Sequence, residues 1–264
     1  MQKQTSTTDE ALVTAIRANL CALYRSLAGN PSPGNKVKWT SSLPHPWFNG
    51  ILVSQPPTPE DETYIQEMIQ TFKEHKVESF TWWLEPHLSI AEWEPFLSKH
   101  GFIFSNDIPG MAIDLKDMTT PMPTIDGFEI QAVTNTETLQ DWVNAFAPGY
   151  GLPLEWKPFI FETWSSLGLD LPVRNYIGYL HGKAVATSCL FLGGGVAGIY
   201  SVSTLPEARG KSIGLAMTVK PLHDARDLGY RIATLQSSKM GFNIYKKIGF
   251  KHLCQIEHFY YVNQ

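Results

Sequence analysis

Residues 205–216 (LPEARGKSIGLA) constrain the fold of this chain most, because they join a run that predicts a β-strand to a run that predicts a helix. We expect the strand at 198–204 and the helix at 212–228. The N–H groups in the first turn of a helix have no intrahelical acceptor and carry partial positive charge, so a loop of low bulk placed there encloses an anion. Gly210 and Gly214 give this loop its low bulk. The junction therefore predicts a phosphate-binding site.

The loop contains neither GxGxxG nor GxxxxGK followed by Ser or Thr, so dinucleotide and P-loop chemistry are not favoured. It resembles instead the acetyl-CoA loop of the GCN5-related N-acetyltransferase (GNAT) family, which reads Arg or Gln, two residues, Gly, one residue, then Gly or Ala. Arg209 and Gly214 match this pattern, and Ser212 stands where the family has Gly. A Ser N–H still donates a hydrogen bond there if its φ is negative, and its hydroxyl adds a donor. The alternative is an ordinary strand-to-helix connection with a helix-starting Ser.

A second motif follows at the expected distance. After a strand predicted at 230–236, the short helix predicted at 241–248 resembles the GNAT segment GxxxYxxxGF, with Gly241, Tyr245 and Gly249-Phe250 in place. The two motifs in this order imply an α/β fold of the GNAT type, in which helices cover both faces of a mixed central sheet.

The resemblance also implies roles for single residues, with acetyl-CoA as the acetyl donor. Main-chain groups of a splayed strand around Val202 and Thr204 pair with the pantetheine arm, and N–H groups of the loop hold the diphosphate. The hydroxyl of Tyr245 protonates the departing thiolate as a general acid, unless this residue is only a half-buried aromatic whose hydroxyl lies in water. The implied cofactor-binding residues are Val202, Thr204, Arg209, Gly210, Lys211, Ser212, Ile213, Gly214 and Asn243.

The chain of 264 residues is too long for one GNAT unit, which by the family resemblance needs roughly 140 to 160 residues. A strand predicted at 78–84, a helix at 90–100 and a following Gly-Phe pair repeat the order of the second motif, with Leu97 in the position of Tyr245. We interpret this as a duplication whose first unit, 1–118, lost the cofactor chemistry, and whose second unit, 126–264, is the acetyltransferase. Coincidence is the alternative, since helices ending in Gly are common.

The sequence says less about which residues of the second unit bind the acceptor. We expect a strand at 128–132, a helix at 137–145 and then a loop at 146–158, which borders the acceptor in this family. Tyr150, Glu155 and Trp156 are the candidate substrate contacts in this loop, and solvent-facing loop residues are the alternative. Glu155, Glu162 and Glu257 are candidate general bases by residue type alone.

Composition restricts the function classes. A net charge of −4 and a pI near 6.1 argue against nucleic acid as the main partner. Three cysteines without CxxC spacing, and histidines without a ligand-pair motif, imply no metal, and no apolar run is long enough for a membrane span. Together with these exclusions, the resemblance implies a cytoplasmic N-acetyltransferase that moves an acetyl group from acetyl-CoA directly to a primary amine of a small molecule or peptide. The alternatives are a non-catalytic acyl-CoA sensor or interaction module, and a tandem aminoacyl or long-chain acyl transferase.

Overall fold

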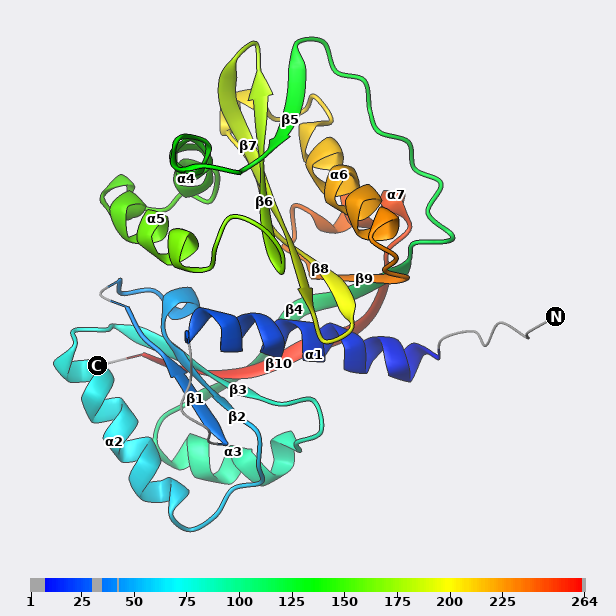
Figure 1. The fold of residues 1–264 in the computed structure, drawn as a ribbon. Coiled ribbons are helices and arrows are strands. Elements are labelled where there is room, and N and C mark those ends of the chain that lie inside the picture. The colour runs from blue at the N-terminus through cyan, green and yellow to red at the C-terminus, as the bar shows by residue number, and fades with distance from the viewer. Residues whose placement is uncertain (1–7, 30–34, 42, 263–264) are drawn as a thin grey trace. The chain divides into compact units, whose positions relative to one another are not determined.

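A computed structural model describes residues 8–29, 35–41 and 43–262 (Figure 1). The chain forms two compact units. Unit 1 comprises Met1–Asn19 and Pro109–Cys254, and unit 2 comprises Leu20–Ile108 and Gln255–Gln264. This division differs from the predicted ranges 1–118 and 126–264, because each unit contains residues from both ends of the chain.

Unit 1 is a mixed sheet with helices on both faces, as predicted. Its strand order is β4-β9-β8-β7-β6-β5, in which β8 and β9 are parallel and the other neighbours are antiparallel. The hydroxyl of Tyr176 donates to Asp224 of α6, and the hydroxyl of Tyr179 donates to Asp141 of α4. The two tyrosines are three residues apart on β6, so their side chains point to opposite faces of the sheet. Helices α4 and α6 therefore cover opposite faces. The strands are β4 (Ile103–Asp114), β5 (Phe128–Ala132), β6 (Val173–Leu180), β7 (Lys183–Gly193), β8 (Val196–Thr204) and β9 (Ile232–Gln236). The helices are α4 (Thr136–Gly149), α5 (Lys157–Ser166), α6 (Ile213–Asp227) and α7 (Phe242–Ile248).

Helix α4 is longer than predicted. It begins with a capping box between Asn135 and Thr138, and its rings at Trp142 and Phe146 stack 4.6 Å apart along one face. Packing of this apolar stripe extends the helix to Gly149, so the prediction of a loop from residue 146 was wrong. The connection to α5 is only the short segment 150–156, which contains the 3-10 turn η2 (Leu154–Trp156).

Unit 2 repeats part of this plan around an aromatic core. Its strands follow the order β1-β2-β3-β10, with β2 and β3 parallel and α2 between them in the chain. The helix predicted at 90–100 and the strand predicted at 78–84 are confirmed within one residue. The elements are β1 (Lys36–Trp39), the 3-10 turn η1 (Pro46–Phe48), β2 (Gly50–Val53), α2 (Asp61–Glu74), β3 (Ser79–Leu84), α3 (Ile90–Lys99) and β10 (Lys251–Val262), and α1 (Asp9–Leu27) is divided between the units.

Each unit takes its last strand from the other half of the chain. In unit 1, β9 pairs antiparallel with residues 110–114 of β4. In unit 2, β3 pairs antiparallel with residues 259–262 of β10. The shared order of strand, helix, parallel strand, helix and exchanged strand supports the proposed duplication, and the exchange explains why linear boundaries did not describe the units.

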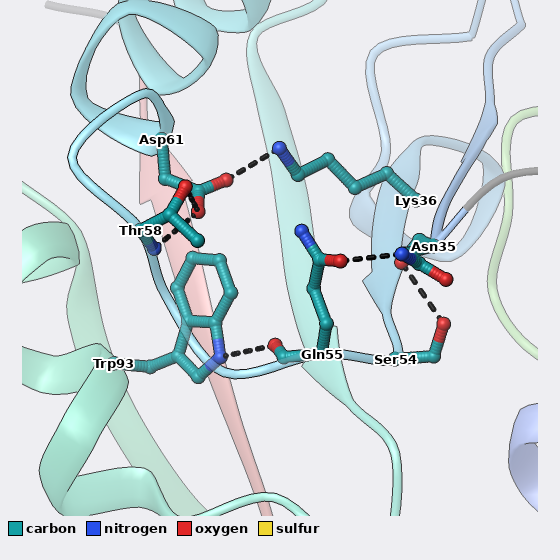
Figure 2. A network of polar contacts seen from close by, with 7 residues as sticks. All are labelled: Asn35, Lys36, Ser54, Gln55, Thr58, Asp61 and Trp93. Carbon is teal, nitrogen blue, oxygen red and sulfur yellow. Dashed lines mark hydrogen bonds and ion pairs between the residues drawn. The ribbon is translucent and has the colours of Figure 1, made fainter.

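The start of α2 is closed by a network of polar contacts (Figure 2). The carboxylate of Asp61 is fully buried and accepts hydrogen bonds from the N–H of Thr58 at 2.7 Å and from its hydroxyl at 3.1 Å. Its other oxygen lies 2.5 Å from Nζ of Lys36, with the geometry of an ion pair rather than a hydrogen bond. The indole of Trp93 donates to the carbonyl of Gln55 at 3.2 Å. The first turn of α2 is therefore occupied by the protein's own carboxylate.

We expect Asp61→Asn to lower the free energy of unfolding by about 3 kcal/mol, near the lower end for a broken buried ion pair, because Lys36 keeps 22% of its side chain exposed. Urea unfolding measures this loss. Glu67→Gln removes an exposed carboxylate elsewhere on α2 and serves as the control, with an expected change within about 0.5 kcal/mol. Equal changes for the two variants would show that the pair does not hold α2.

Candidate functional site

Strand β8 separates from β9 over most of its length. The two strands pair only at Ala197 with Ala233 and at Gly198 with Thr234. Beyond this point β8 continues to pair with β7 as far as Thr204, so its other edge carries no strand partner among the described residues. This is the splayed strand that the resemblance implied around Val202 and Thr204.

A β-bulge lies in the separated part of β8. Cys189 of β7 pairs with Tyr200 and Thr187 pairs with Ser203, so two β8 residues stand opposite one residue of β7. Ser201 has φ +53°, and its carbonyl accepts a hydrogen bond from the hydroxyl of Thr187 at 2.7 Å. The bulge changes the direction of the main chain in the part of β8 that has no strand partner on its other edge.

The loop between β8 and α6 presents a row of unpaired N–H groups. The N–H groups of Ala208 and Arg209 bond to carbonyls within the preceding turn, whereas those of residues 210–215 have no acceptor in the described part of the chain. A Cβ on Gly210 would meet nothing within 4 Å, and one on Gly214 would meet only side-chain atoms at 3.8 Å. At these two positions no described side chain crowds the main chain, so the start of α6 fits an anion such as a diphosphate. The N–H of Arg209, which the sequence included in this set, is used internally.

Ser212 adopts the left-handed conformation, with φ +60° and ψ 13°. The negative φ on which the predicted donation by Ser212 was conditional is therefore not present. Its side chain makes no capping hydrogen bond, so nothing local offsets the strain, which amounts to about 1 kcal/mol for a residue with a Cβ. The family pattern has Gly at this position because Gly adopts this conformation without strain.

We expect Ser212→Gly to raise the free energy of unfolding by about 0.5 kcal/mol, since relief of the strain exceeds the entropy that Gly adds to the unfolded chain. Thermal unfolding measures the gain. Ser238→Gly is the control, because Ser238 has no positive φ and its hydroxyl accepts from the N–H of Gly241, so it is expected to destabilise. A loss of stability in Ser212→Gly would contradict the strain.

The side chain of Arg209 joins three segments instead of covering the start of α6. Its Nε donates to the carbonyl of Thr204 at 3.1 Å, and its Nη2 donates to the carbonyl of Gly149 at 3.4 Å. It thus ties the loop to the end of β8 and to the end of α4. Among the other predicted residues, Lys211 and Asn243 are exposed and the side chain of Ile213 is buried.

Tyr245 is buried, with 8% of its surface exposed, so it is more buried than a half-buried aromatic. Its ring packs over Gly241, where a Cβ would lie 2.6 Å from Cε2 and 3.2 Å from the hydroxyl oxygen. Gly241 therefore makes room for the ring. Burial raises the pKa of Tyr245 to about 12, so the residue stays a neutral phenol at physiological pH.

The three candidate substrate residues separate in the structure. Tyr150 follows the last turn of α4, and its hydroxyl donates to the carbonyl of Val202 at 3.2 Å. Glu155 is exposed and Trp156 half-buried in η2. Sequence reasoning missed Gly149, because no sequence pattern marks it. A Cβ at this position would lie 2.5 Å from Oγ of Ser203, so Gly149 is needed where α4 approaches β8.

Of the candidate bases, Glu162 is exposed on α5, and Glu257 lies in unit 2. No group of three metal-binding side chains occurs in the regions that the structure describes. Across the same regions, no helix has both the length and the apolar character needed to cross a membrane.

No family model matches the sequence, and no curated protein matches it. Solved structures do. A GCN5-related N-acetyltransferase from Kribbella flavida is 18% identical, with 93% of this chain and 94% of that chain covered and a TM-score of 0.64. One from Sphaerobacter thermophilus is 18% identical, with 94% and 92% covered and a TM-score of 0.60. A tandem GNAT protein from the clavulanic acid biosynthesis pathway is 13% identical, with 81% and 75% covered and a TM-score of 0.55. The chain has the fold of the GCN5-related N-acetyltransferases.

Proposed function

We propose that this protein is an acetyl-CoA-dependent N-acetyltransferase that transfers the acetyl group directly to a primary amine of a small molecule or peptide. The observation that carries the proposal is the row of unpaired N–H groups at 210–215, placed beside the unpaired edge of β8. The loop and β8 lie close together at Gly214, since a Cβ there would lie 3.8 Å from Oγ1 of Thr204 on β8. We assign the N–H groups at 210–215 to a diphosphate, and we assign to an amide-containing arm those main-chain groups of β8 that neither β7 nor the side chains of Tyr150 and Arg209 engage.

Acetyl-CoA supplies the activated acyl group, so the protein has to position it and stabilise the charge that develops on sulfur. Tyr245 is the group that we assign to the thiolate. A thiol has a pKa of about 8.5, roughly 3.5 units below the pKa of Tyr245, so complete proton transfer to the thiolate is uphill by about 5 kcal/mol. We therefore assign Tyr245 a hydrogen bond to the developing thiolate, and we take the amine as the net source of the proton. This refines the general-acid role that the resemblance implied.

Unit 2 lacks the corresponding features. Its strands β2 and β3 stay paired to Val53 and Leu84, and the N–H of Glu85 continues the pairing, so no edge is open. The segment before α2 contains three prolines, which have no N–H to donate, and the buried Asp61 occupies the first turn. We propose one donor site for each chain.

Isothermal titration with acetyl-CoA, followed by thermal unfolding in its presence, tests the proposal. We expect one molecule bound for each chain, and at a concentration of one hundred times the Kd a stabilisation of about 2.7 kcal/mol. A panel of amines with release of free thiol as the readout then identifies the acceptor. Absence of binding and of any thermal shift would contradict the proposal.

A non-catalytic acyl-CoA sensor is the second candidate, favoured by the strained Ser212 in the loop. Such a module binds the donor without releasing thiol in the presence of any amine. Tyr245 distinguishes the two candidates, because its hydroxyl contributes to catalysis only when charge develops on sulfur.

A further inference from the structure

An aromatic stripe on α4 holds the ring of Tyr150 in place. The rings of Trp142 and Phe146 stack 4.6 Å apart, and the rings of Phe146 and Tyr150 lie 4.8 Å apart. These residues recur every four positions and share one face of the helix. Tyr150 is therefore fixed by packing and is not part of a loose loop.

The end of α4 is also clamped against β8. Gly149 lies so close to Ser203 that a Cβ on Gly149 would be 2.5 Å from Oγ of Ser203. The guanidinium of Arg209 bridges the carbonyls of Gly149 and Thr204. The last turn of α4 and the separated part of β8 thus keep one relative position.

The hydroxyl of Tyr150 contacts β8 at a residue further from the loop than Thr204, which Arg209 contacts. It donates to the carbonyl of Val202, two residues before Thr204. An arm that enters from the loop at 210–215 and follows β8 reaches Thr204 first and Val202 afterwards, so Tyr150 stands at its reactive end.

We propose that the ring of Tyr150 selects the length of the acyl chain, by closing the far end of the arm's path so that a two-carbon acyl group fits and longer chains are excluded. The inference rests on the proposed function and assigns Tyr150 to the donor instead of the amine. Tyr150 keeps 36% of its surface exposed, so removal of the ring opens the path to solvent and gives longer chains room.

Titration of acetyl-CoA, butyryl-CoA and free CoA into the full chain tests the inference, with Tyr150→Ala and Tyr150→Phe as variants. We expect the wild-type protein to bind acetyl-CoA at least about tenfold more tightly than butyryl-CoA, since each excess methylene in a closed pocket costs roughly tenfold or more. Tyr150→Ala is expected to reduce this ratio to about threefold or less, whereas Tyr150→Phe keeps the ring and the ratio. Free CoA, which lacks an acyl group, is expected to bind all three proteins alike.

Two outcomes overturn the inference, and they are distinguishable. If free CoA and acetyl-CoA bind but the wild-type protein does not discriminate butyryl-CoA, or Tyr150→Ala retains the discrimination, the selection by Tyr150 is wrong and the donor site stands. If none of the three ligands binds the wild-type protein, the proposed function fails and the inference fails with it.

Discussion

Tyr245→Phe is expected to lower kcat about 100-fold while the Kd for acetyl-CoA changes by no more than about threefold. Tyr245 is a buried residue with a neutral phenol, so the hydrogen bond that we assign to it gains strength only when the sulfur becomes negative. Steady-state kinetics with the identified amine, together with titration of acetyl-CoA, measure the two quantities. Tyr179→Phe is the matched control, because it removes a hydroxyl that donates to Asp141 on the α4 face.

The pH dependence provides a further check on Tyr245. A phenol whose pKa is raised from 10 to about 12 remains protonated below that value, so activity that needs the phenol is kept through pH 10 and is lost only as the pH approaches 12. The same shift makes its contribution to stability fully present below pH 10 and progressively lost above it. Unchanged kcat in Tyr245→Phe, or an alkaline loss of activity centred near pH 10 that this variant abolishes, would contradict the assignment.

Gly214→Glu is expected to stabilise the free protein and to abolish binding of acetyl-CoA. Gly214 lies in the first turn of α6, where Glu has a better helix propensity by about 0.5 to 1 kcal/mol and interacts favourably with the helix dipole. A Cβ there has only ordinary contacts at 3.8 Å, so the side chain is accommodated. Its carboxylate, however, lies at the start of α6, where we place the diphosphate, and we expect the Kd to rise at least about 100-fold, roughly 2.7 kcal/mol.

Thermal unfolding and titration measure the two effects of Gly214→Glu separately. Asn144→Asp adds the same charge at an exposed position of α4 and is expected to leave the Kd unchanged. A variant that binds acetyl-CoA normally would contradict the location of the site. A variant that loses both stability and binding would show that Gly214 is required by the fold.

The local elements of the fold were predictable because their signals are local. Gly229 and Gly249 both have positive φ just after a helix, as the sequence indicated. Strand β4 was not predicted, because its polar residues and Pro109-Gly110 break the alternation that marks a strand. Its partner β9 lies more than a hundred residues away in the chain, so neither this pairing nor the exchange of last strands has a sequence pattern.

The donor side of the site was more predictable than the acceptor side. The loop depends on main-chain groups and on glycines at fixed spacing, which a sequence displays directly. The left-handed conformation of Ser212 was also signalled, by the Gly that the family pattern has at that position, whereas the predicted role of Ser212 was conditional on a negative φ. Tyr150 stacks on Phe146, which is a local contact, but its hydrogen bond to Val202 and the close approach of Gly149 to Ser203 join residues more than fifty positions apart, so the sequence did not show them.

The central claim is that the main-chain N–H groups of residues 210–215 hold the donor. Titration of acetyl-CoA into ¹⁵N-labelled protein, observed by amide chemical shifts and by hydrogen exchange, tests it most directly. We predict the largest shift changes and the strongest new protection at residues 210–215, with smaller changes at Val202 and Thr204 along β8. Changes that leave this loop unaffected, or that centre on the start of α2 in unit 2, would contradict the claim.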